Sequence, residues 1–136
     1  MTKKTNTPSD IDKVYGIINL FMDCFIKVDK RIKKSELALT AVGEELDLGS
    51  LDWLDVIVEL ENVFQIKIET DGLFGCNVEK LLRTCTQELV KQGRLTTTQE
   101  ALVFERYKVL HTWLNAREQQ GKQKTAVVKD TKTNTK

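Results

Sequence analysis

A single serine, Ser50, begins an acidic, leucine-rich stretch within "EELDLGSLDWLDVIVELE", residues 44–61. Acids and aliphatic residues follow the serine in steps of three and four, which is typical of an α-helix. A small hydroxyl at a helix start has two common uses. It can accept a bond from a backbone N–H as the N-cap, or it can serve as an exposed oxygen to which another group is attached. The sequence leaves both interpretations of Ser50 open.

The other side chains with useful chemistry are scattered along the chain. His111 is the only histidine, and neither a Ser/His/Asp set nor a phosphate loop is evident. The cysteines Cys24, Cys76 and Cys85 are odd in number and lack CxxC spacing, so we interpret them as small core residues. We therefore expect a protein that is not an enzyme and holds no metal.

Charge is unevenly distributed, although the net charge of the chain is only +1. The window 44–71 contains nine acids and one base, which gives it a net charge of −8. Asp52, Asp55 and Glu59 are spaced to cluster on the outside of a helix. This pattern favours docking of basic partners, but it is equally typical of a solvated helix face. Trp53, beside these acids, is interpreted either as a docking anchor or as a half-buried packing residue.

Apolar residues at helical spacing predict an all-α fold. The expected helices span residues 10–27, 50–64, 78–92 and 98–120. Ser9, Asn77 and Thr97 stand where N-caps are expected, and Gly93 and Gly121 stand where helices are expected to end.

The long connection 28–49 contains four apolar residues that we expect to attach it to the core, namely Ile32, Leu37, Leu39 and Leu46. Residues 9–93 are predicted to form one bundle and 97–120 an additional C-terminal helix. We expect that helix to pack on its own bundle through an apolar stripe of Leu102, Val109, Leu110, Trp113 and Leu114. Residues 1–8 and 121–136 are expected to be disordered.

Residues 47–64, "DLGSLDWLDVIVELENVF", resemble the acyl carrier proteins and the related carrier domains of polyketide and peptide synthetases. The family motif is Asp-Leu-Gly, two variable residues, Ser-Leu, then acids and aliphatics ending in Leu-Glu. Leu51, the pair Leu60-Glu61 and Phe64 match that motif, and a weaker resemblance covers residues 10–92. Two features depart from the family. The residues between glycine and serine, including the usual aspartate, are missing, and residues 97–136 have no counterpart in a minimal carrier.

The resemblance implies an acyl-carrier-like helical bundle in which Ser50 bears 4'-phosphopantetheine. The arm would carry acyl groups as thioesters, as in fatty acid biosynthesis. The family's partner-facing acids correspond to Asp52 and Asp55, and helical spacing places Glu59 on the same side as these two acids. Trp53 is a candidate anchor for a docked partner. The implied partners are a phosphopantetheinyl transferase and acyl-processing enzymes with basic patches. The alternative is an unmodified carrier fold that acts only as a protein-interaction module.

Several broader classes are disfavoured by composition. The N-terminus, "MTKKTNTPSD", turns polar where the apolar part of a signal peptide should begin. No apolar run approaches the roughly 18 residues that a membrane span needs, and the lysine-rich tail is too diffuse to indicate nucleic-acid binding. We expect a cytoplasmic monomer.

Overall fold

The computed structural model describes residues 8–71, 73 and 75–135, with residues 8–9 and 120–135 described by their backbone only. Within this range the chain is helical and contains no β-strand, which confirms the all-α class. The elements are α1 (Pro8–Val28), the 3₁₀ turn η2 (Lys34–Glu36), α2 (Ser50–Phe64), α3 (Val78–Lys91) and α4 (Thr97–Thr135). The expected disorder of residues 1–7 lies outside the described residues.

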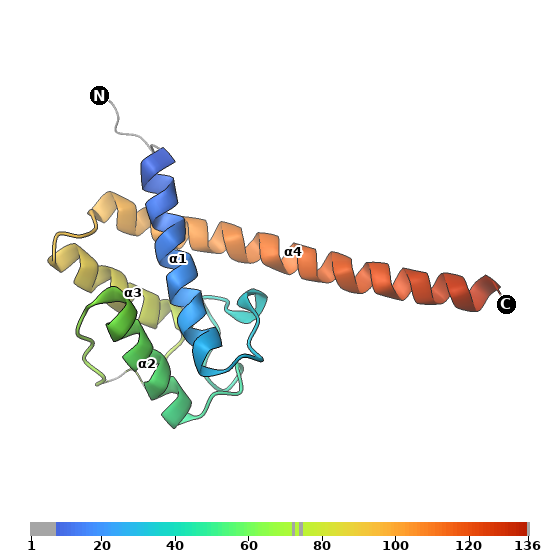
Figure 1. Cartoon of the computed structure of the whole chain (residues 1–136), viewed down its shortest axis with the longest axis horizontal. Coiled ribbons are helices and arrows are strands. Elements are labelled where there is room, and N and C mark those ends of the chain that lie inside the picture. The colour runs from blue at the N-terminus through green and yellow to red at the C-terminus, as the bar shows by residue number, and fades with distance from the viewer. Residues whose placement is uncertain (1–7, 72, 74, 136) are drawn as a thin grey trace.

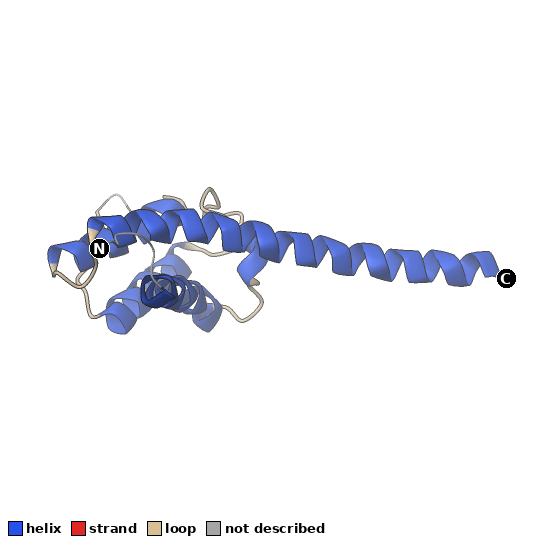
Figure 2. Cartoon of the chain, turned by 90° about the horizontal axis from the view of Figure 1, so that it is seen from above, coloured by secondary structure: helices blue, strands red, loops and turns tan. Residues whose placement is uncertain are grey.

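The helix α1 lies at the centre of the arrangement, in contact with α2 on one side and α4 on the other (Figure 1). Helix α3 contacts both α2 and α4, and η2 contacts α4 and α1. Seen from above, α4 runs along one side of the molecule and continues beyond the other helices (Figure 2). The three shorter helices therefore form the body, and α4 covers part of it before extending away.

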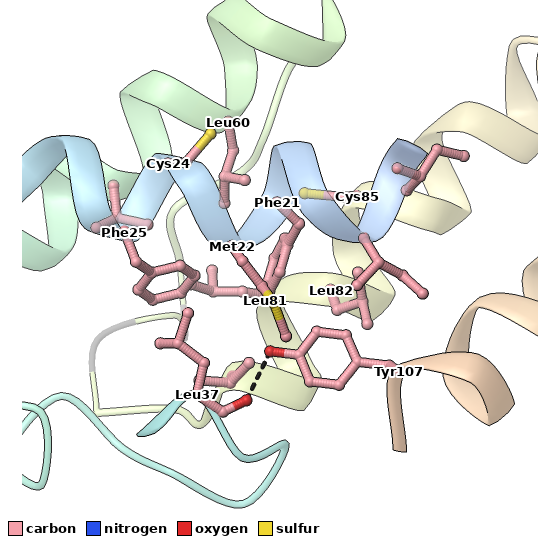
Figure 3. Close-up of a cluster of buried hydrophobic side chains, with 14 of the residues drawn as sticks. Phe21, Met22, Cys24, Phe25, Leu37, Leu60, Leu81, Leu82, Cys85 and Tyr107 are labelled. Atoms are coloured by element: carbon pink, nitrogen blue, oxygen red, sulfur yellow. Dashed lines mark hydrogen bonds between the residues drawn. The ribbon is translucent and has the colours of Figure 1, made fainter. Parts of the chain in front are cut away.

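The core is built mainly from the apolar stripe of α1, which reaches the other three helices. Figure 3 shows Phe21, Met22 and Phe25 among side chains from the rest of the fold, including Leu37, Leu60, Leu81, Leu82 and Tyr107. Each fully buried apolar side chain of this kind contributes about 1.5–3 kcal/mol to folding. Cys24 and Cys85 are also buried, as expected for small core residues, and burial raises the pKa of the Cys24 thiol to about 11.

For two of the three expected N-caps, the helix begins at a different residue from the one predicted. Helix α1 begins at Pro8, so Ser9 lies inside the helix, because the fixed φ of proline suits the first helical position. Helix α4 begins at Thr97, and its capping hydroxyl belongs to Thr96, which accepts from the Gln99 N–H at 3.0 Å. Asn77 is confirmed as the N-cap of α3, since its side chain accepts from the Lys80 N–H at 3.0 Å.

The expected packing of the C-terminal helix on its own bundle is present, and it uses part of the expected stripe, because Leu102 is buried and Leu110 is partly buried against the core. Leu102, Val103 and Tyr107 are buried, whereas Val109 and Trp113 are exposed, Trp113 by 52%. Val103 and Tyr107, which lie one turn apart, complete the buried face, so this face is rotated away from Val109 and Trp113.

The expected end of the last helix at Gly121 is wrong. Helix α4 continues through Gly121 to Thr135, so the segment expected to be disordered is helical up to that residue. A glycine in a helix interior costs only about 1 kcal/mol relative to alanine. It ends a helix where it takes a left-handed conformation, as Gly93 does after α3 with a φ of 73°.

Candidate functional site

The helix α2 starts at Ser50, but Ser50 is not its N-cap. Gly49 holds that position with an extended backbone (φ −75°, ψ 179°), and no side chain makes a capping bond there. The first backbone bond of the helix runs from the Trp53 N–H to the Gly49 carbonyl at 2.9 Å. Ser50 is exposed, and its hydroxyl is not used to cap the helix. The first N–H groups of a helix lack partners within it, so the hydroxyl stands beside backbone donors.

A pocket of about 220 Å³ opens next to Ser50. The connection before α2 and the first turn of α2 form most of its wall, and Gly75, from the connection before α3, completes it. The lining residues are Val42, Gly43, Glu44, Leu48, Gly49, Ser50, Trp53 and Gly75. The wall at Gly43 is tight, because a Cβ there would meet the Leu48 carbonyl at 3.1 Å and the Trp53 ring at 3.3 Å. The attachment candidate therefore stands at the mouth of a small pocket with an aromatic wall.

Trp53 is a core residue and not a docking residue, contrary to one of the two sequence interpretations. Its side chain is 3% exposed, and its indole N–H donates to the Leu73 carbonyl at 2.8 Å. Its ring lies 6.0 Å from that of Phe25 in an edge-on arrangement. The signal that could have placed it was present in the sequence, because Trp53, Ile57 and Leu60 follow each other in steps of four and three.

Replacing Trp53 with alanine is expected to lower the free energy of unfolding by about 3–5 kcal/mol, since it leaves a cavity in the core. Urea unfolding followed by circular dichroism measures this loss. Trp53→Phe is the matched control, because it keeps an aromatic ring but removes the bond to Leu73, and it should cost less than half as much. A loss below 1 kcal/mol for Trp53→Ala would contradict the buried position.

The three acids predicted to form one docking cluster are divided by the structure. Asp55 is exposed and Asp52 is partly exposed, whereas Glu59 faces α1 and forms an ion pair with Lys27 at 3.2 Å. Sequence reasoning missed two apolar members of the same surface: Leu51 is 77% exposed and Val58 is 44% exposed. We call the surface formed by Leu51, Asp52, Asp55 and Val58 the outer face of α2. It combines charge with apolar area, a combination typical of protein-binding surfaces.

A basic residue, Arg31, lies among the acids near the N-terminal end of α2. Arg31 is paired with Asp29 at 2.8 Å and lies 4.0 Å from Asp47. Hydrogen bonds from the Arg31 side chain and backbone lower the pKa of Asp29 to about 2. Because that pKa is depressed, the pairing stabilises the fold at neutral pH, and this stabilisation is lost as the pH falls from about 4 towards 2.

Among the described residues, neither a metal-binding cluster nor the single histidine forms a competing site. The described part of the chain contains no cluster of three or more His, Cys, Asp or Glu side chains able to hold a metal. His111 lies on α4, where its Nε2 donates to the Ser35 carbonyl at 2.9 Å. None of the described helices has both the length and the apolar character needed to cross a bilayer. Comparison with protein-family models, with curated proteins and with solved structures gives no match.

Proposed function

We propose that this protein is an acyl carrier in which the Ser50 hydroxyl is the attachment point for 4'-phosphopantetheine. The observation that carries the proposal is the position of Ser50, exposed at the first residue of α2, free of any capping role and beside the 220 Å³ pocket. A serine at the N-cap position normally accepts a bond from the helix backbone. Ser50 instead follows the N-cap Gly49, so its hydroxyl is left available to an incoming group.

The residues around Ser50 suit a phosphodiester at that oxygen. The hydroxyl would lose its proton to a base on the transferase and attack the phosphorus of coenzyme A that bears the pantetheine. The new ester bond to phosphorus would form as the pyrophosphate P–O bond breaks, and adenosine 3',5'-bisphosphate would leave. The backbone N–H groups of the first turn and the positive end of the helix would stabilise the negative charge of the ester. When bound, the group supplies a thiol on which acyl chains are held as thioesters. The chain itself performs no catalysis in this function.

The outer face of α2 is proposed to bind the transferase and acyl-processing enzymes. Asp52 and Asp55 would attract basic patches on those enzymes and raise the rate of encounter. Leu51 and Val58 supply apolar area close to those charges. Glu59 is assigned a smaller role than the sequence indicated, because Lys27 already neutralises it.

A second candidate function is an unmodified carrier fold that acts as a protein-interaction module. The specific observation in its favour is the 77% exposure of Leu51, which provides a binding surface that needs no attached group. Gly49 also directly precedes Ser50, where the family places an aspartate. Both candidates use the same face of α2 and differ in whether Ser50 is modified.

The deciding experiment is intact mass spectrometry of the protein after incubation with coenzyme A and a broad-specificity phosphopantetheinyl transferase. The carrier function predicts a gain of one phosphopantetheine arm per chain. Absence of that gain with several different transferases would contradict the carrier function and favour the interaction module.

The charge of the outer face gives a second test. Reversing both Asp52 and Asp55 to lysine is expected to slow loading by about tenfold at low ionic strength, because exposed charges act mainly on encounter. The effect should shrink at high salt, where such charges are screened. The measurement is the initial loading rate at two salt concentrations.

The matched control reverses two exposed acids away from α2, Asp12 on α1 and Glu105 on α4, which changes the net charge by the same amount. It should leave the loading rate close to that of the parent protein. Equal slowing by both double variants would assign the effect to overall charge and remove the role of the outer face.

A further inference from the structure

The long connection before α2 contains a segment whose backbone is held by α4. We call residues 35–41 the strap. The Ser35 carbonyl accepts from His111 Nε2 at 2.9 Å, and the Leu37 carbonyl accepts from the Tyr107 hydroxyl at 2.6 Å (Figure 3 shows the second bond). Both donors are on α4, one turn apart. A segment without regular pairing needs such partners, because unsatisfied buried carbonyls are costly.

The same pattern continues along the strap with donors from α3. The Leu39 carbonyl accepts from the Glu79 N–H at 2.8 Å, and the Ala41 carbonyl accepts from the Val78 N–H at 2.9 Å. Every second carbonyl from residue 35 to residue 41 is thus bonded, the first two by α4 side chains and the last two by the start of α3.

The end of the strap leads directly into the wall of the Ser50 pocket. Val42 and Gly43 follow Ala41 and line that pocket together with Ser50. The turn that connects them to α2 is closed by a bond from the Leu48 N–H to the Gly43 carbonyl at 2.8 Å. The position of the pocket wall therefore depends on where the strap is held.

We propose that Tyr107 and His111 are positioning residues for the Ser50 site: by holding the strap, they fix the pocket wall against which Ser50 is presented. This assigns a role to α4, the helix that a minimal carrier lacks, and it rests on the proposed function. Neither residue touches Ser50, and both act through the backbone of the strap.

Tyr107 and His111 are both suited to donate a hydrogen bond to a carbonyl of the strap. Tyr107 is fully buried, its ring lies 6.1 Å from that of Phe21, and burial raises the pKa of its hydroxyl, which therefore stays a neutral donor at physiological pH. A carbonyl can only accept, so His111 Nε2 carries the hydrogen.

The test is Tyr107→Phe in the full-length protein, which removes the donor and keeps the ring. We expect amide hydrogen exchange at Leu46 and Leu48, in the turn behind the pocket wall, to become about tenfold faster. For loading of Ser50, we expect kcat to fall about three- to tenfold while KM stays within twofold, because the outer face of α2 is unchanged.

Thr86→Val is the matched control. It removes a partly buried hydrogen bond, from the Thr86 hydroxyl to Glu100 at 2.8 Å, which joins α3 to the first turn of α4. It should leave exchange at Leu46 and Leu48 and the kcat of loading unchanged. His111→Gln is a conservative variant that can retain a donor near Nε2, and it should behave closer to the parent than His111→Ala does.

Unchanged exchange at Leu46 and Leu48 in Tyr107→Phe, or equal acceleration in Thr86→Val, would overturn the proposal and leave α4 a purely structural role. A parent protein that no transferase loads would instead overturn the proposed function. The exchange measurement needs no loading, so it would still decide whether α4 holds the pocket wall.

Discussion

Replacing Ser50 with alanine is expected to abolish the mass gain of one phosphopantetheine arm completely. The proposed function uses a single oxygen, and no neighbouring side chain can take its place at the first residue of α2. Intact mass spectrometry of parent and variant, treated with the same transferase and coenzyme A, measures the effect. Thr97→Ala is the matched control, because Thr97 is an exposed hydroxyl at the first residue of α4.

The same variant separates the two interpretations of the serine by its stability. Loss of a true N-cap costs about 1 kcal/mol, which would lower Tm by roughly 4 °C. Because Gly49 is the N-cap and the Ser50 side chain makes no capping bond, Ser50→Ala should melt within about 1 °C of the parent. A variant that melts clearly lower yet still gains the arm would contradict both the structural assignment and the attachment site.

Ending the chain after Gly93 is expected to cause the largest loss of stability. The cut removes Leu102, Val103 and Tyr107, and burial of three such side chains contributes about 5–9 kcal/mol. That is comparable to the entire stability of a typical small domain. Thermal unfolding by circular dichroism should show a Tm lowered by about 20 °C or more, together with increased binding of a dye that reports exposed apolar surface.

The matched control ends the chain after Gln119 and removes only the part of α4 that extends beyond the other helices (Figure 1). The ion pair between Glu118 and Lys33, at 2.8 Å, lies before that cut and is kept. This shorter chain should melt within about 2 °C of the parent. If the chain ending at Gly93 melted unchanged but lost a dimer or a bound partner, α4 would be an interaction arm and not part of the core.

The sequence was sufficient to predict the helices where local patterns decide the structure. The bounds of α2, residues 50–64, follow from an uninterrupted apolar pattern that starts after Gly49 and ends before a left-handed residue, Gln65. The burial of Ile32, Leu37, Leu39 and Leu46 in the long connection was likewise predictable, because apolar residues in a polar segment have to find the core.

Features that depend on distant partners could not be predicted. The helical spacing of Trp53 with Ile57 and Leu60 indicated a buried position, but the partners of its side chain, Leu73 and Phe25, lie in other segments and were not predictable. The bond between Tyr107 and Leu37 joins residues 70 positions apart, and one side of it is a carbonyl that every residue possesses. The rotation of α4 was missed for the same reason, since Leu102, Val109 and Trp113 are equally apolar and only tertiary packing distinguishes them.

The way the strap is held affects which substitutions the protein should tolerate. Its bonds to α3 and α4 use its carbonyl groups, which do not change when side chains change. The exposed strap position Thr40 should therefore vary widely without loosening the strap. Tyr107 and His111 supply the matching donors through their side chains and should vary little. In a mutational scan, the substitutions that disturb the pocket wall should therefore fall in α4, more than 60 residues after the wall in the sequence.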